Sequence, residues 1–272
     1  MNQVKIFIDL IRLKKPIGFM LLFWPCAWGL TLAYDFSENL NDYFFYLALF
    51  FLGSILMRSA GCIVNDILDK EFDKKVFRTK DRPIASNQIS IRLGIFYVII
   101  LCSLALLVLL NFNSFTIFLA LGSMPLAFTY PLMKRYTYWP QLFLGITFNY
   151  GIILGWTAIN GKIDVVPIIL YLGAIFWTLG YDTIYGYQDI KDDEIIGLKS
   201  TSIKFKNNPH KFLIICYSIF LINLLITGLL MKLNNFYYLI FILIFTQMIY
   251  FQLKKLDIKN NIKCLNTFKS TN

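Results

Sequence analysis

Residues 58–83 read RSAGCIVNDILDKEFDKKVFRTKDRP, an apolar run that ends in a cluster of carboxylates and then in cations. At about 100° per residue in a helix, the polar side chains of this stretch fall within an arc of roughly 100°. They are Arg58, Cys62, Asn65, Asp66, Asp69 and Asp73. Carboxylates this close together raise each other's pKa values unless positive charge lies between them, and their oxygens suit a hard divalent cation. A solvated helix end just outside a membrane explains the cluster equally well.

A second carboxylate cluster, DTIYGYQDIKDD at residues 182–193, also closes a long apolar run. Asp182, Tyr185, Asp189 and Asp193 are spaced i, i+3, i+7 and i+11, which again is one helical face. Asp182 lies about two turns deeper than Asp189, and an acid inside a membrane span is expensive enough to indicate a function. The two acidic faces together predict one shared site.

The composition of the chain indicates which solvent surrounds it. Of its 272 residues, 57% are hydrophobic and only 15% are charged, and the mean hydropathy is +0.61. This apolar content exceeds what a water-soluble core can bury, so we expect an all-α polytopic membrane protein. Eight runs approach the roughly 20 residues that a helix needs to cross the hydrocarbon. They are 16–34, 43–64, 92–111, 114–131, 139–160, 165–187, 210–231 and 235–253.

The distribution of cations predicts the orientation in the membrane. Cytoplasmic loops carry the excess of Lys and Arg, and a cytoplasmic N-terminus places 24 of the 26 cations inside, leaving only Lys162 and Lys232 outside. Both acidic clusters and the active site then face the cytoplasm, and we expect a bacterial cell inner membrane. No stretch resembles a removed signal peptide. The net charge of +10 suits anionic inner-leaflet lipids, and we expect neither nucleic-acid binding nor an obligate protein partner.

The two acidic clusters lie four spans apart, so two halves of four helices would place them at equivalent positions, as in a parallel internal repeat. The expected fold is therefore a bundle of eight transmembrane helices, built as two four-helix halves around one cytoplasm-facing cavity. We treat residues 1–272 as a single domain. Its expected parts are an interfacial amphipathic segment at 1–15, cytoplasmic catalytic loops at 65–91 and 188–210, and a basic tail at 254–272.

Facing sets of acids with cations beside them suit a diphosphate held through Mg²⁺, whose octahedral coordination the phosphate oxygens complete. Cations that could neutralise the same group are Arg78, Arg82, Lys134, Arg135 and Lys199. The ordinary excess of positive charge in cytoplasmic loops also accounts for each of them singly. A lipid diphosphate fits, with its head at the membrane rim and its tail between helices. The five cysteines and the single histidine show no spacing typical of zinc, haem or disulfides.

Several motifs of the sequence resemble those of a known family. NDILDKEFD is similar to the first aspartate motif, NDxxDxxxD, of the UbiA superfamily of membrane-embedded prenyltransferases, and DTIYGYQDIKDD followed by GLKSTSIKF resembles the second. RLKKPIGFMLLFWP, RTKDRPIAS and YPLMKRYTYWPQ look like the branch that prenylates 4-hydroxybenzoate. The resemblance covers most of the chain to about residue 205. The family has nine helices where the hydropathy here predicts eight, and the difference falls in the last span.

The resemblance implies transfer of a polyprenyl group from polyprenyl diphosphate to the ring of 4-hydroxybenzoate, ortho to the hydroxyl, in ubiquinone synthesis. It implies one Mg²⁺ site at Asn65, Asp69 and Asp73 and another at Asp189 and Asp193. Asp66, Asp182 and Asp189 carry catalytic or supporting roles in this interpretation.

Arginine is the expected partner of the acceptor carboxylate because its fork matches two oxygens. Arg58 and Arg12 are the candidates, and Tyr185 is expected in the aromatic wall of the pocket. Asn149, polar in mid-span, either contacts substrate or makes a helix-to-helix hydrogen bond. Other functions stay open: another aromatic acceptor, such as a dihydroxynaphthoate, homogentisate or haem, or an ion-coupled transporter with buried acids.

Overall fold

The computed structural model describes residues 3–258 and 260–270, and within these ranges the chain forms helices and no strands. By contact the chain divides into two compact units, residues 1–132 with 154–162, and residues 133–153 with 163–272. The first holds α1 (Gln3–Leu10), α2 (Ile17–Ala33), α3 (Leu40–Leu68), α4 (Lys70–Asp73), α5 (Ile91–Leu109), α6 (Ser114–Thr129), a 3-10 turn (Tyr130–Leu132) and most of α9 (Gly151–Asn160).

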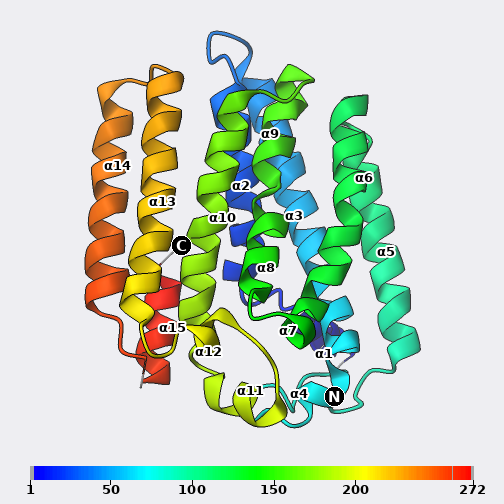
Figure 1. The fold of residues 1–272 in the computed structure, drawn as a ribbon. Helices are drawn as coiled ribbons and strands as arrows, with labels where there is room; N and C mark the ends of the chain where they lie inside the picture. The colour runs from blue at the N-terminus through cyan, green and yellow to red at the C-terminus, as the bar shows by residue number, and fades with distance from the viewer. Residues whose placement is uncertain (1–2, 259, 271–272) are drawn as a thin grey trace. The chain divides into compact units, whose positions relative to one another are not determined.

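The second unit holds the remaining helices (Figure 1). They are α7 (Met133–Tyr136), α8 (Pro140–Asn149), α10 (Val165–Gly186), α11 (Ile190–Ile196), α12 (Thr201–Lys204), α13 (Pro209–Leu230), α14 (Asn235–Gln247), a π-helical extension of it (Met248–Lys254) and α15 (Asn261–Lys269). α10 packs against α8, α13 and α15, while α13 and α14 run side by side.

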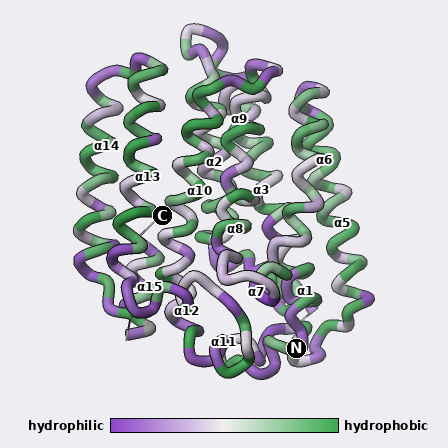
Figure 2. Tube along the Cα trace, in the orientation of Figure 1, coloured by the Kyte–Doolittle hydropathy of each residue, from purple (hydrophilic) through white to green (hydrophobic). Residues whose placement is uncertain are grey.

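The expected spans are confirmed as apolar helices, and Figure 2 shows hydrophobic residues along them with hydrophilic residues toward their ends. Seven helices among the described residues are long and apolar enough to cross a membrane. The expected first span is the exception, because α2 has only 17 residues, a few fewer than the roughly 20 required. Side-chain oxygens of Asn39, Ser90, Asn113, Asp164 and Asn234 cap the first turns of five spans.

The fifth expected span differs most from the predicted division into halves. Tyr150 separates α8 from α9, and residues 154–162 group with the first unit. Two features of α9 explain this. A Cβ on Gly155 would lie 2.2 Å from the Cys26 carbonyl oxygen, so only glycine allows α2 so close. The Asn113 amide also donates to the carbonyl oxygens of Thr157 and Ala158, at 2.8 and 3.1 Å.

The helices α1 and α15, which lie near the two ends of the described residues, are more tightly packed than the sequence predicted. The amphipathic helix expected within residues 1–15 forms as α1, but Ile6 and Leu10 are buried in a core cluster with Ile63 of α3 and Leu101 of α5. The segment expected as a basic tail contains α15, which packs on α10. Its Cys264 is fully buried. The sequence did not predict this packing because the segment is polar in composition, although one face of α15 is apolar.

Candidate functional site

The first acidic cluster lies where α3 ends. The sequence predicted one helical face through Asp73, but α3 ends at Leu68, and Asp69 separates it from the short α4. Two backbone hydrogen bonds keep the path nearly helical, from Asp69 N–H to the Asn65 carbonyl at 2.9 Å and from Asp73 N–H to the Asp69 carbonyl at 2.8 Å. Asp66, Asp69 and Asp73 are only 1%, 1% and 6% exposed. A solvated helix end therefore does not describe them.

Two arginines pair with these buried acids. Arg82 Nη1 lies 3.2 Å from Asp66 Oδ1 and 2.7 Å from Asp73 Oδ2. Arg12 Nη2 pairs with the same Asp66 oxygen. Buried charges persist only when they are paired and hydrogen-bonded, so the guanidinium groups are part of the local fold. Sequence reasoning selected both arginines but assigned them to substrate groups, and that assignment stays a prediction.

The loop after α4 returns Arg82 to the acids. The Thr79 hydroxyl donates to the Asp73 carbonyl at 3.1 Å, and Arg82 N–H donates to the Thr79 carbonyl at 3.0 Å. Thr79 is 4% exposed, so this turn is a buried support that sequence reasoning missed. On the exposed side, Lys74 holds the pKa of the Glu71 carboxyl below its usual value by a 2.7 Å hydrogen bond. Arg78 is also exposed.

The second acidic cluster begins inside α10 and continues past its end. α10 ends at Gly186, a turn carries the chain through Asp189, and α11 contains Asp193. The predicted continuous helical face is therefore wrong beyond Gly186, because a turn interrupts it. Asp182, Asp189 and Asp193 are half-buried. Gly197 ends α11 in the left-handed conformation, with φ of +80°.

Two of the cation candidates meet beside this second cluster. Lys199 N–H donates to the Lys134 carbonyl at 2.8 Å, and Lys199 Nζ lies 3.2 Å from the Tyr136 carbonyl. The sequence placed Lys134, Arg135 and Lys199 in one group, and these backbone contacts bring their two segments together within the second unit. Their proposed contact with diphosphate stays a prediction.

A buried hydroxyl network docks the segment after α11 onto α10. The Thr183 and Thr201 hydroxyls lie 2.6 Å apart, and the Ser202 hydroxyl donates to the Thr183 carbonyl at 2.8 Å. Thr201 N–H donates to Gln141 Oε1 of α8 at 3.0 Å. A Cβ on Gly186 would lie 2.3 Å from Ser202 Oγ. The repeated hydroxyls of the sequence KSTS were the available signal, and sequence reasoning did not assign them.

The residues expected to contact the acceptor have different surroundings. Arg58 is half-buried, and a Cβ on Gly18 would lie 2.8 Å from its Nε. Asn149 is fully buried, and its amide donates to Ala174 O at 3.1 Å and Thr178 Oγ1 at 2.7 Å, the helix-to-helix alternative. The Tyr185 ring centroid lies 4.6 Å from that of Phe268 in α15, a partner the sequence did not predict.

The donor set of the first cluster fits a magnesium ion. Within residues 3–258 and 260–270, no group of three His, Cys, Asp or Glu side chains is arranged to hold a metal unaided. Magnesium commonly takes only one or two carboxylates and completes its octahedron with water and substrate phosphates. Asp69 and Asp73 with the Asn65 amide supply hard oxygen donors of that kind. The prediction that both acidic clusters face one cavity stays a prediction.

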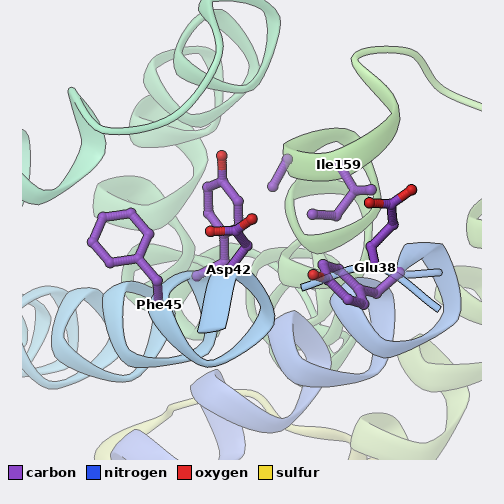
Figure 3. Close-up of a pocket in the computed structure, with 7 residues that line it drawn as sticks. Glu38, Asp42, Phe45 and Ile159 are labelled. Atoms are coloured by element: carbon purple, nitrogen blue, oxygen red, sulfur yellow. The ribbon is translucent and has the colours of Figure 1, made fainter. Parts of the chain in front are cut away.

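A separate cavity of about 450 Å³ lies at the opposite end of α3 (Figure 3). Its lining comprises Tyr34, Glu38, Asp42, Phe45, Tyr46, Ala158 and Ile159. Asp42 and Asp66 are 24 residues apart on α3, which corresponds to about 36 Å of helix. This cavity is therefore not part of the acidic cluster.

Curated proteins with related sequences include mitochondrial 4-hydroxybenzoate polyprenyltransferases. The chain is 49% identical over 208 residues to the mitochondrial 4-hydroxybenzoate polyprenyltransferase of Rattus norvegicus, covering 76% of this chain and 55% of that protein. It is 47% identical over 213 residues to the protein of the same name from Arabidopsis thaliana, covering 78% and 52%. The chain thus spans about half the length of the curated relatives it matches.

Solved structures share the fold. A UbiA homolog from Aeropyrum pernix K1 superposes with a TM-score of 0.71 at 22% identity, covering 92% of this chain and 96% of that one. A UbiA homolog from Archaeoglobus fulgidus bound to DMAPP and Mg²⁺ gives a TM-score of 0.71 at 17% identity, covering 97% and 96%. The family model for UbiA prenyltransferases matches residues 22–272. With the acidic motifs and the helical bundle, this match establishes that the chain belongs to the UbiA prenyltransferase family.

Proposed function

We propose that this chain transfers a polyprenyl group from polyprenyl diphosphate to the ring of 4-hydroxybenzoate, ortho to the hydroxyl, and depends on Mg²⁺. The observation that carries the proposal is the trio of buried carboxylates Asp66, Asp69 and Asp73 at the end of a membrane span, with Arg12 and Arg82 among them. Curated relatives named for this reaction, at 49% and 47% identity, support the choice of acceptor.

Four of the acids and one amide are proposed as metal ligands. Asn65, Asp69 and Asp73 would hold one Mg²⁺, and Asp189 and Asp193 another. A bound Mg²⁺ supplies positive charge to the diphosphate oxygens as the prenyl group leaves. The homolog from Archaeoglobus fulgidus bound to DMAPP and Mg²⁺ supports this pairing of ion and substrate.

The cations are proposed to bind the leaving group. In the reaction the prenyl C–O bond breaks, a C–C bond to the ring forms, and the ring carbon loses its proton. Negative charge builds on the departing diphosphate, and fixed cations in a site closed to bulk water stabilise it strongly. The proposed residues are Arg78, Arg82, Lys134, Arg135 and Lys199. The backbone contact between Lys199 and Lys134 supports a common role for two of them.

The acceptor carboxylate is proposed to pair with Arg58. Loss of a buried charge-assisted pair costs about 2–5 kcal/mol, so Arg58→Ala should raise the apparent KM for 4-hydroxybenzoate far more than that for the prenyl diphosphate. Gly18→Ala offers a milder perturbation, because the added Cβ meets only the flexible end of the Arg58 side chain, at 2.8 Å. It should shift the same KM in the same direction by a smaller factor. A loss of diphosphate affinity alone would move Arg58 to the leaving-group site.

The membrane and orientation are also proposals. A multi-pass protein with 24 of 26 cations on one side is expected to keep its N-terminus and acidic motifs in the cytoplasm of a bacterial cell, at the inner membrane. A fluorescent protein that folds only in the cytoplasm, fused at the N-terminus, should fluoresce in the inner-membrane fraction. A dark fusion of normal abundance contradicts the orientation.

The test of the reaction uses purified protein with Mg²⁺, polyprenyl diphosphates of several lengths and a panel of aromatic acceptors. We expect prenylated 4-hydroxybenzoate as the main product and no product after chelation. Asp69→Ala and Asp189→Ala should abolish turnover while leaving the fold intact, because each removes a proposed metal ligand, and a melting curve of each variant checks that the protein is folded. Asp81→Asn, which changes an exposed acid of the same loop, is the matched control. Preference for another acceptor, or near-normal activity of either alanine variant at limiting Mg²⁺, contradicts the proposal.

A further inference from the structure

The turn that follows α1 places an arginine where helices usually carry glycine. Leu13 N–H donates to the Ile8 carbonyl at 3.2 Å and Arg12 N–H to the Asp9 carbonyl at 3.3 Å, the two bonds of a Schellman motif. Arg12 therefore has a left-handed backbone, with φ of +56°. Glycine adopts this conformation without steric cost, whereas other residues do so less readily.

Other helix ends in the same chain show that the backbone alone does not explain Arg12. Gly197 fills the corresponding position after α11, with φ of +80°. Lys232 fills it after α13, with φ of +49° and an exposed side chain. Arg12 differs from both because its guanidinium reaches Asp66 in the last turn of α3, 54 residues away. The side chain, rather than the turn, distinguishes this position.

Asp66 is shared between two guanidinium groups. Arg12 and Arg82 both contact its Oδ1 oxygen, and its side chain is 2% exposed. Arg82 continues the chain of contacts to Asp73 Oδ2 at 2.7 Å. The charges of Asp66, Asp73, Arg12 and Arg82 sum to zero, so these two buried acids are balanced by the two arginines. An oxygen already shared by two cations is a poor ligand for a third, and this distinguishes Asp66 Oδ1, which two guanidinium groups contact, from Asp73 Oδ2, which Arg82 contacts at 2.7 Å.

We infer that Asp66 is a positioning residue rather than a metal ligand: it holds the N-terminal turn through Arg12 and directs Arg82 toward Asp73 of the first acidic cluster. The consequence for cation and diphosphate binding rests on the proposed function, while the consequence for the N-terminal turn does not. Ile6 and Leu10 anchor α1 in an apolar cluster, and the Arg12–Asp66 pair fixes the polar turn that follows.

The test separates the two roles with paired variants and two readouts. Hydrogen exchange of residues 3–15 reports the N-terminal turn. Mn²⁺ binding followed by electron paramagnetic resonance, alone and with inorganic pyrophosphate, reports the acidic motif. Asp66→Asn should speed exchange at least about tenfold, keep Mn²⁺ affinity within about threefold, and weaken pyrophosphate binding about tenfold at saturating Mn²⁺. Asp73→Asn should abolish Mn²⁺ binding and leave the exchange of residues 3–15 at the wild-type rate.

The Arg12→Gly variant distinguishes loss of the contact between Arg12 and Asp66 from a general folding defect. Glycine suits the left-handed backbone better than arginine, so this variant should keep or raise stability if the turn alone held the segment. We expect faster exchange of residues 3–15 with little change in melting temperature. Asp81→Asn, an exposed acid in the same loop, should change neither readout.

Three outcomes overturn the inference: Asp66→Asn losing Mn²⁺ as Asp73→Asn does, Asp66→Asn leaving exchange at the wild-type rate, or Arg12→Gly keeping residues 3–15 protected. If the wild-type protein binds no Mn²⁺ and no pyrophosphate, the proposed function fails instead. The exchange measurements still decide the positioning role in that case.

Discussion

Gly155→Ala should destabilise the protein through a clash that no side chain can relieve. The added Cβ would lie 2.2 Å from the Cys26 carbonyl oxygen and 2.6 Å from the Leu30 backbone nitrogen of α2. Ordinary contacts begin near 3.5 Å, so the two helices must separate by roughly 1 Å. Overpacking of this kind costs about 1–3 kcal/mol, and the upper end applies because both contacts are backbone atoms. The higher helix propensity of alanine offsets up to about 1 kcal/mol of this cost, so the free energy of unfolding should fall by about 2 kcal/mol.

The measurement is thermal unfolding of the purified variant in detergent. At about 2–4 °C per kcal/mol for a domain of 150–250 residues, the expected fall in Tm is about 4–8 °C. Gly122→Ala in α6 is the matched control, because its Cβ would have no atom within 4 Å. It should leave Tm unchanged or raise it slightly. A Gly155→Ala protein that melts within about 1 °C of wild type refutes the close approach of α2 and α9.

Three further predictions concern the second unit. Asn149→Ala removes donors to Ala174 and Thr178 and should cost about 1 kcal/mol without changing the acceptor KM; a raised KM at unchanged Tm would instead indicate substrate contact. Burial raises the pKa of the Cys264 thiol to about 11, so the neutral thiol is favoured in the fold. The stabilisation that the buried neutral thiol gives the fold should be complete below about pH 9 and lost as pH rises through about 11. Cys264→Ala should remove that part of the pH dependence of Tm. Wild-type and variant proteins with the same loss of Tm at alkaline pH would contradict this. Gly186→Ala places a Cβ 2.3 Å from Ser202 Oγ and should loosen the segment after α11, seen as faster proteolysis there; unchanged cleavage argues against the docking.

Much of the architecture can be predicted from the sequence because, in a bilayer, each apolar segment forms its helix independently of the rest of the chain. A span in hydrocarbon must satisfy its own backbone hydrogen bonds, so an apolar run of about 20 residues suffices to predict a helix. The run at 165–187 accordingly became α10 with nearly the expected bounds, and the run at 43–64 became α3, which is several residues longer at each end. The acidic motifs were equally visible, since spacing alone places their carboxylates at the ends of these helices.

Only the tertiary structure decided which groups neutralise the first acidic motif. The sequence offers many cations near it, and nothing local distinguishes Arg12, 54 residues before Asp66, from its neighbours. The choice depends on where the α1 turn lies after Ile6 and Leu10 are buried against α3 and α5. The packing of α15 on α10 depends in the same way on a single apolar face inside a polar segment. Hydropathy identifies the helices because burial in lipid acts on each run separately, whereas buried charges are balanced by whichever partner long-range packing brings within contact.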